Sequence, residues 1–232
     1  MREISLVIFD CDGVLVDSEY HSATVLIEVF AAIGVHVDLP FVYANFVGHS
    51  FSAVAAKYAR EHGHNVPQSF EEDYRSKLFE RFVGRLKAMP DVEAVIDSLN
   101  VPYCLASGSS PKRVNRSLEI AGLNDRFKDR IFTTTMVKHG KPAPDIFLYA
   151  AKHMNVPPYK CLVIEDSVTG IAAAKAADMT IWHFTGGAHF DHGYERVPQP
   201  YLVNRRFDRM TDFFEAAPQL RRQQEPAHQH GA

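Results

Sequence analysis

Five short apolar segments, separated by stretches with helical spacing, constrain the fold of this 232-residue chain more than any other feature. The segments span residues 4–9, 102–106, 131–134, 161–164 and 180–184. The first is a nearly continuous run of Val, Ile, Leu and Phe, which is typical of a strand buried on both faces. Helix start signals such as Ser110-Pro111 and Ser167 lie between the segments. This alternation predicts an α/β fold, a doubly wound parallel sheet with a Rossmann-like core.

The stretch between the first two segments departs from this rhythm. Its apolar residues keep helical spacing, as in Phe70, Tyr74, Leu78 and Phe82. We therefore predict a small helical domain at residues 18–86, inserted into a larger core formed by residues 1–17 and 87–220. Residues 221–232 contain no apolar side chain larger than alanine, so they are predicted to form a disordered tail.

Composition excludes several classes of protein. A formal net charge of −3 argues against a protein that binds nucleic acid by neutralising its phosphates. No stretch approaches the roughly 18 apolar residues of a membrane span, and the run at residues 4–9 is too short for the core of a signal peptide. Three cysteines, an odd number, indicate reduced thiols buried as small hydrophobic side chains. We therefore expect a cytoplasmic protein without nucleic-acid or membrane partners, and the sequence does not indicate its oligomeric state.

Carboxylates follow two of the predicted strands. Asp10 and Asp12 come directly after the first apolar segment, and Glu165 and Asp166 come directly after residues 161–164. Because ligands bind at the carboxyl ends of parallel strands, we expect these side chains to gather at one site. Oxygen ligands from Asp10, Asp12 and Asp166 suit a hard ion such as Mg²⁺. The alternative for the first pair is a solvated turn with Asp12-Gly13 at its corner.

Two further polar segments follow other predicted strands. Ser107, Gly108 and Ser109 form a small, hydroxyl-rich loop before a helix, where free backbone amides and the helix dipole favour an anion such as phosphate. Plain helix capping is the alternative for this loop. Lys141, between Gly140 and Pro142, could place its positively charged ammonium beside the carboxylates. The alternative is an isolated lysine on the surface.

The order of these motifs resembles the haloacid dehalogenase superfamily of aspartate-nucleophile phosphohydrolases. The matching segments are residues 9–19, 106–109, 140–145 and 163–167, within a resemblance that covers roughly residues 4 to 215. The chain is most similar to the β-phosphoglucomutase-like branch, which includes sugar-phosphate and 6-phosphogluconate phosphatases. This superfamily places a helical cap after its first motif, so the resemblance implies that residues 18–86 form such a cap.

The resemblance implies a role for each motif residue. Asp10 would be the nucleophile that forms an aspartyl-phosphate. Asp12 would protonate the leaving alcohol and then activate water, and it would also contact the phosphate. Ser107 and the Gly108 amide would hold the transferring phosphoryl group. Lys141 would pair with both the nucleophile and the phosphate.

The implied metal is Mg²⁺. Its ligands would be Asp10, the Asp12 carbonyl and Asp166, with Glu165 as a further ligand or directly behind them. With this metal, we expect a phosphomonoester hydrolase that acts on a small phosphorylated metabolite, a sugar phosphate. A sugar phosphomutase of the β-phosphoglucomutase type is the first alternative. Non-enzymatic alternatives, such as a module that binds phosphate on an aspartate, are disfavoured because all four motifs are intact and a helical domain is inserted.

The remaining expectations concern histidines and small residues outside the motifs. The resemblance implies that Gly48, His49 and Ser109 contact substrate, although His49 also fits a plain surface position. His21 lies near the acid/base histidine of the mutases, but the mutases carry an extra residue in that stretch. The segment at residues 186–200, with His189 and His192, is predicted to be a mobile surface loop rather than a cover over the site.

Overall fold

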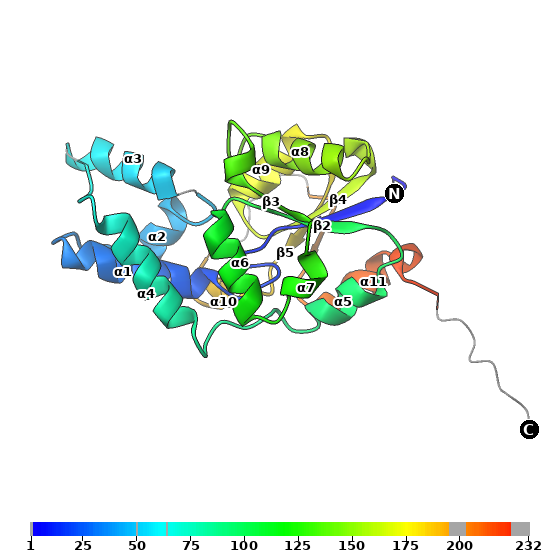
Figure 1. Cartoon of the computed structure of the whole chain (residues 1–232), viewed down its shortest axis with the longest axis horizontal. Helices are drawn as coiled ribbons and strands as arrows, with labels where there is room; N and C mark the ends of the chain where they lie inside the picture. The colour runs from blue at the N-terminus through cyan, green and yellow to red at the C-terminus, as the bar shows by residue number, and fades with distance from the viewer. Residues whose placement is uncertain (1, 50, 64, 195–202, 224–232) are drawn as a thin grey trace, which may run out of the picture.

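A parallel six-stranded sheet forms the centre of the molecule in the computed structural model, which describes residues 2–49, 51–63, 65–194 and 203–223 (Figure 1). The strands are β1 (Leu6–Phe9), β2 (Tyr103–Ser107), β3 (Ile131–Thr133), β4 (Cys161–Glu165), β5 (Thr180–Phe184) and β6 (Arg205–Phe207). Their order is β3-β2-β1-β4-β5-β6, and each neighbouring pair is parallel. The predicted doubly wound α/β fold is therefore confirmed, with its switch point between β1 and β4.

Helices cover both faces of the sheet. The helices that flank it are α5 (Val92–Ser98), α6 (Pro111–Ile120), α7 (Asn124–Phe127), α8 (Asp145–His153), α9 (Val168–Ala176) and α11 (Phe213–Ala216). Helices α8 and α9 lie over one face, and α5, α6, α7 and α11 lie over the other (Figure 1). Side chains of β1 alternate accordingly, because Val7 and Phe9 pack with the second group while Leu6 and Ile8 pack with the first. This double cover explains why the strands are continuous apolar runs.

Helix starts follow the signals in the sequence. Ser110 precedes Pro111, and its hydroxyl accepts a hydrogen bond from the Arg113 amide at 3.4 Å. The Ser167 hydroxyl accepts one from the Gly170 amide at 3.1 Å at the start of α9. Both caps lie directly beyond strand ends, so the sequence elements that begin these helices also position loops at the carboxyl edge of the sheet. Short 3-10 turns occupy Thr134–Met136, Pro158–Lys160, Met210–Asp212 and Pro218–Leu220.

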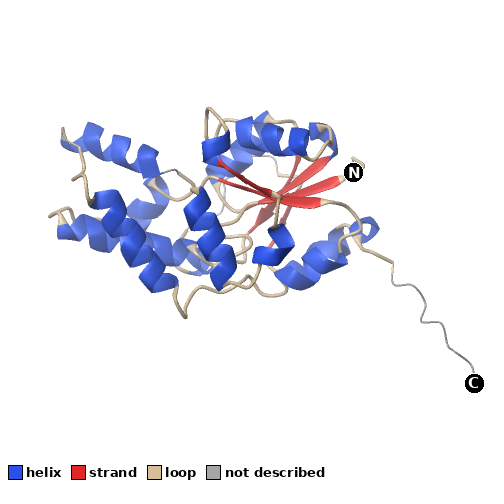
Figure 2. Cartoon of the chain, in the orientation of Figure 1, coloured by secondary structure: helices blue, strands red, loops and turns tan. Residues whose placement is uncertain are grey.

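Four helices between β1 and α5 form an all-helical region beside the sheet (Figure 2). They are α1 (Glu19–Ala32), α2 (Leu39–Asn45), α3 (Phe51–His62) and α4 (Phe70–Phe82). Phe30 of α1 joins them, because its ring centroid lies 5.6 Å from Phe46, 5.8 Å from Tyr58 and 5.0 Å from Phe70. Aromatic packing therefore connects α1 with the three helical segments that follow it.

The sixth strand was not predicted from the sequence. β6 contains only three residues, two arginines followed by Phe207. Phe207 is the buried residue of the three. An edge strand has one partner and one open side, so it needs no continuous apolar run. Its pairing with β5, from Trp182 opposite Arg205 to Phe184 opposite Phe207, extends the sheet by one strand.

The prediction of a mobile surface loop at residues 186–200 is wrong for its first part, while residues 195–200 lie outside the described residues. Helix α10 (Ala188–Asp191) occupies this stretch, and His189 is completely buried. The Ala188 amide donates to Asp17 Oδ1 at 3.0 Å, which ties the helix to the end of the first motif. The rings of His189, Phe190 and Tyr194 pack together within 4.2–5.2 Å.

The predicted tail also begins too early. Arg221 forms an isolated bridge with Leu99, and the Arg222 amide donates to the Ser98 carbonyl at 2.7 Å. Backbone pairing with the end of α5 holds these residues, although their side chains are polar. Residues 224–232, with His228 and His230, lie outside the described residues.

Replacement of Phe30 tests the aromatic packing of the helical region. Phe30 is 1% exposed, so Phe30→Ala should lower the free energy of unfolding by about 3–5 kcal/mol. Urea unfolding followed by far-UV circular dichroism measures this change. As a control, Val83→Ala at a side chain that is 61% exposed should change it by less than about 0.5 kcal/mol. A loss for Phe30→Ala as small as for the control would contradict the packing described.

Candidate active site

A cavity of about 320 Å³ lies at the carboxyl ends of β1, β2 and β4, between the sheet and the helices α1–α4. Residues from both regions line it. From the core come Asp10, Asp12, Ser107, Gly108, Ser109, Ser110, Arg113, Thr134, Thr135, Lys141, Asp166 and Ser167. From the helical region come Glu19, Ser22, Gly48, His49, Tyr74 and Arg75, among others. The cavity is at the switch point of the sheet, where α/β proteins bind their ligands.

Lys141 lies between two carboxylates at the base of this cavity. Its Nζ donates to Asp10 Oδ1 and to Glu165 Oε1, each at 2.6 Å. Burial favours the neutral amine, but the charges of Asp10 and Glu165 outweigh it and hold the pKa of Lys141 above its usual value. The lysine is therefore an ammonium that joins the loop after β3 to the ends of β1 and β4.

Three carboxylates form an acidic cluster around this ammonium. Asp10, Glu165 and Asp166 are buried and offer oxygens that all lie within 4.8 Å of one another. Burial is the main cause that raises the pKa of Asp10 and of Asp166 well above the usual range, and repulsion from Glu165 adds to it. If all three were ionised, they would carry more negative charge than Lys141 neutralises, and a second cation would relieve the repulsion.

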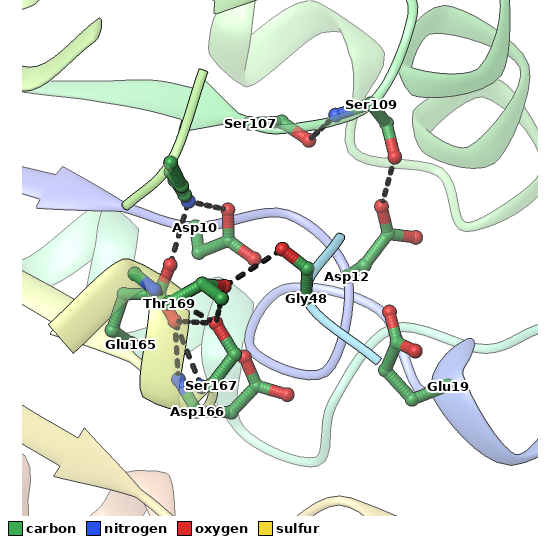
Figure 3. A network of polar contacts seen from close by, with 12 residues as sticks. Asp10, Asp12, Glu19, Gly48, Ser107, Ser109, Glu165, Asp166, Ser167 and Thr169 are labelled. Atoms are coloured by element: carbon green, nitrogen blue, oxygen red, sulfur yellow. Dashed lines mark hydrogen bonds and ion pairs between the residues drawn. The ribbon is translucent and has the colours of Figure 1, made fainter. Parts of the chain in front are cut away.

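Oxygen donors are the right chemistry for a divalent cation such as Mg²⁺. Asp166 Oδ2 is buried and has no aligned hydrogen-bond partner among the residues that the structure describes, so the Asp166 carboxylate can take a cation. The Glu165 carboxylate is already occupied: Oε1 binds Lys141, and Oε2 accepts from the amides of Asp166 and Ser167 at 2.9 Å each (Figure 3). The residues therefore fit a metal held by Asp10 and Asp166, with Glu165 behind them.

The Asp12 carboxylate lines the same cavity as Asp10 and Asp166 but is not part of the three-carboxylate cluster. It turns toward Ser109 instead (Figure 3), and it accepts from Ser18 Oγ at 2.6 Å, Ser109 Oγ at 2.7 Å and an Arg113 nitrogen at 2.8 Å. Burial by itself would raise the pKa of Asp12, but the Arg113 charge and these hydrogen bonds lower it below the usual value. Asp12 is therefore ionised.

Sequence reasoning missed Arg113 and Glu19. Arg113 also donates to Ser22 Oγ at 2.9 Å, and the same nitrogen lies 3.9 Å from Glu19 Oε1. Burial, with the negative charge of Asp12, raises the pKa of Glu19 to about 7. The sequence signal for Arg113 was its place in the first turn after the Ser-Gly loop. Because α6 also contains Lys112 and Arg116, the sequence does not indicate which of the three basic residues reaches the site.

The loop after β2 has the form expected of an anion cradle. Ser107 ends the strand, Gly108 and Ser109 follow it, and all three line the cavity. The Ser109 amide donates to Ser107 Oγ at 3.0 Å, which holds the loop in a tight turn ahead of α6. The first backbone amides of α6 have no partners within the helix, so they favour an anion at this end.

The helical region reaches the site through Gly48. The Gly48 carbonyl accepts a hydrogen bond from Thr169 Oγ1 of α9 at 2.7 Å (Figure 3). The φ angle of Gly48 is +75°, and a β-carbon on Gly48 would lie 2.6 Å from Thr169 Oγ1, so this position requires glycine. His49 lines the cavity beside it, whereas His21 is not among the lining residues.

A doubly wound sheet with a buried lysine and three carboxylates at its switch point defines this protein as an α/β enzyme with an acidic, oxygen-lined site. The chain belongs to the haloacid dehalogenase-like hydrolases, whose family model matches residues 4–178.

Particular relatives agree with this family. The chain is 28% identical over 190 residues to 6-phosphogluconate phosphatase of Escherichia coli strain K12, which covers 82% of this chain and 86% of that protein. It is 29% identical over 174 residues to fructose-1-phosphate phosphatase YqaB of the same strain, which covers 74% and 92% respectively. A haloacid dehalogenase-like protein from Agrobacterium tumefaciens superposes with a TM-score of 0.77 at 29% identity, covering 93% of this chain and 98% of that one.

Gly170 provides a test of the Glu165 arrangement. A β-carbon at Gly170 would lie 1.7 Å from Glu165 Oε1, so Gly170→Ala must displace the carboxylate that holds Lys141 and the start of α9. We expect unfolding free energy to fall by about 1–3 kcal/mol, although alanine normally stabilises a helix by up to about 1 kcal/mol relative to glycine. Denaturant unfolding measures the change. Gly140→Ala, whose β-carbon would lie 3.6 Å from Thr134 Cγ2, is the control and should be neutral or slightly stabilising. Equal stability of Gly170→Ala and the wild type would contradict the arrangement.

Proposed function

We propose that the chain is a Mg²⁺-dependent phosphomonoester hydrolase that acts on a small phosphorylated metabolite, a sugar phosphate, through an aspartyl-phosphate at Asp10. The observation that carries the proposal is the ion pair between Lys141 Nζ and Asp10 Oδ1, 2.6 Å apart in a cavity that the Ser107 loop also lines. A carboxylate held by a buried ammonium beside an anion-binding loop is suited to receive a phosphoryl group.

Asp10 acts as the nucleophile in this proposal. One carboxylate oxygen forms a bond to phosphorus while the bond from phosphorus to the alcohol oxygen breaks, which yields the aspartyl-phosphate and the alcohol. Lys141 favours the ionised form of Asp10, because its ammonium is 2.6 Å away. Water then attacks the phosphorus, and the products are inorganic phosphate and free Asp10.

Asp12 moves the protons. Because Arg113, Ser18 and Ser109 keep it ionised, it can accept a proton from the attacking water in the second step. In the first step it gives a proton to the departing alcohol oxygen, so it must be protonated when substrate is bound. A dianionic phosphate in the cavity favours this, since a nearby negative charge raises the pKa of a carboxyl group.

The phosphoryl oxygens are bound by Ser107 Oγ and by the backbone amide of Gly108. These donors are fixed before substrate arrives, so no reorganisation is needed as charge develops. Asp10, Asp166 and the Asp12 carbonyl would hold Mg²⁺, with Glu165 behind them. When bound, this ion neutralises charge on the phosphoryl oxygens.

We further propose that residues 18–86, which contain α1–α4, act as a cap that covers the site, and that residues 1–17 and 87–220 form the catalytic core. Gly48 and His49 of the cap, with Ser109 of the core, would then contact the alcohol part of the substrate. A sugar phosphate is supported by the names of two relatives, a 6-phosphogluconate phosphatase and a fructose-1-phosphate phosphatase.

The cellular setting belongs to the same proposal. All three cysteines are free and buried, which is compatible with a reducing cytoplasm. Over the described residues, the structure contains no helix with the length and apolar character of a membrane span. We therefore propose a cytoplasmic enzyme whose partner is its small-molecule substrate.

The proposal is tested by phosphate release from a panel of sugar phosphates with Mg²⁺ present. Excess chelator should remove turnover, and Asp10→Asn should abolish it, because an amide cannot form the aspartyl-phosphate. Asp125→Asn, at an exposed aspartate on α7, is the matched control and should keep full activity. Full turnover by Asp10→Asn would disprove the nucleophile. Interconversion of sugar 1- and 6-phosphates with little free phosphate would instead establish the mutase alternative.

The role of Asp12 predicts a dependence on the leaving group. Asp12→Asn should slow hydrolysis of alkyl phosphates by about 10²- to 10⁴-fold, the usual scale for a lost general acid or base. Aryl phosphates should lose less in the phosphoryl-transfer step, because their alcohols leave without needing a proton. Single-turnover kinetics on both substrate classes measures the difference. Equal losses for the two classes would show that Asp12 does not protonate the leaving group.

A further inference from the structure

His189 of α10 is a buried polar side chain that the proposed reaction leaves without a role. Its ring is completely buried, and its Nε2 lies 3.1 Å from Oδ2 of Asp166, which is 2% exposed. Among the described residues, neither ring nitrogen nor Asp166 Oδ2 has an aligned hydrogen-bond partner. Two unpartnered polar groups in contact, both shielded from water, are costly unless they pair with each other or with a ligand.

We propose that His189 is a positioning residue for the metal site: its Nε2–H donates to Asp166 Oδ2 and thereby directs the other oxygen of this carboxylate toward the divalent cation. The inference rests on the proposed function, because it assigns a task to His189 only if Asp166 is a metal ligand. The two atoms already lie within hydrogen-bond distance of each other.

Glycines on both sides fix the positions of the two groups. A β-carbon on Gly187 would lie 2.6 Å from Cε1 and 2.7 Å from Nδ1 of His189, so the backbone at Gly187 packs directly against the ring. A β-carbon on Gly13, whose φ is +76°, would lie 2.0 Å from Asp166 Oδ2. The Asp166 carboxylate thus lies between Gly13 and the His189 ring. A side chain larger than that of glycine would not fit at Gly13 against the carboxylate or at Gly187 against the ring.

The helix that carries His189 is anchored to the first motif. The Ala188 amide donates to Asp17 Oδ1 at 3.0 Å, and Asp17 follows the loop of Asp10 and Asp12. Directly after α10, His192 stacks on Tyr20 of α1 with centroids 3.9 Å apart. These contacts connect α10 at both ends to the segment that carries the nucleophile, so the His189 ring keeps its place relative to Asp10.

A second histidine holds the backbone of Asp166. His183 of β5 is buried, and its Nε2 lies 3.1 Å from the Asp166 carbonyl. Arg206 Nε donates to His183 Nδ1 at 3.2 Å, so Nδ1 is the acceptor and the Nε2–H donates to the Asp166 carbonyl. The backbone of Asp166 is therefore fixed by β5 and β6, and what remains to be oriented is its carboxylate.

Loss of such an orienting donor usually weakens metal binding by about 10- to 100-fold. The test measures the dissociation constant of Mn²⁺, a paramagnetic probe for the Mg²⁺ site, with the full chain by electron paramagnetic resonance. His189→Leu keeps bulk but removes the donor, and should weaken Mn²⁺ binding by about 10- to 100-fold. His189→Gln places an amide donor near the position of Nε2 and should restore binding to within about threefold of the wild type.

His153→Leu is the matched control, the same change at an exposed histidine of α8 that contacts Tyr149, and should leave Mn²⁺ binding unchanged. If His189→Leu does not fold, Gly187→Ala provides the second variant, since its β-carbon displaces the ring and should weaken binding in the same way. Melting temperatures of the metal-free proteins are recorded for each variant.

The inference would be overturned if His189→Leu bound Mn²⁺ with wild-type affinity, or if His189→Leu and His189→Gln weakened Mn²⁺ binding equally. Either outcome would leave the proposed phosphatase function standing. Failure of wild-type protein to bind Mn²⁺ would overturn the metal site of the proposed function itself, and this inference with it.

Discussion

The Lys141 ammonium between Asp10 and Glu165 is the interaction on which the rest of the site depends. Each contact is 2.6 Å long, and all three groups are withdrawn from water. Removal of one partner from such a buried set leaves an uncompensated charge, which typically costs about 3–5 kcal/mol. The ammonium also joins the loop after β3 to the ends of β1 and β4. The contacts that favour the ionised form of Asp10 therefore also hold the carboxyl edge of the sheet together.

The cavity separates its carboxylates into two electrostatic environments. Asp10 and Asp166 share a crowded acidic cluster, where burial raises the pKa of both. Asp12 lies apart from them and is paired with Arg113, which lowers its pKa. Pairs of titratable groups whose surroundings shift their pKa values in opposite directions are typical of sites that divide nucleophilic and proton-transfer roles. In this chain the two environments follow from side-chain direction, since Asp10 and Asp12 are only two residues apart.

Elements outside the four motifs complete the site by packing against them. Gly48 brings the helical region onto Thr169 at the start of α9, and α10 ties His189 to Asp166 while Asp17 holds its first turn. Two of these contacts require glycine at a close approach, Gly48 beside Thr169 and Gly13 beside Asp166. A closely packed boundary of this kind excludes water from the acidic cluster and strengthens every charge interaction within it.

The sequence by itself determined the strands β1 to β5, the helix starts at Ser110 and Ser167 and the order of the polar motifs, because each is encoded in the periodicity or capping of adjacent residues. It did not determine β6 or α10, whose short polar segments owe their structure to neighbours on the sheet edge and to Asp17. Only the tertiary structure decided how the side chains pair. Lys141 meets Asp10 across 131 residues of sequence and Arg113 meets Asp12 across 101, so one carboxylate joined the cluster and the other left it. Such pairs form where folding brings charged groups that are far apart in the sequence together out of water. A local sequence pattern does not specify which distant residues will meet.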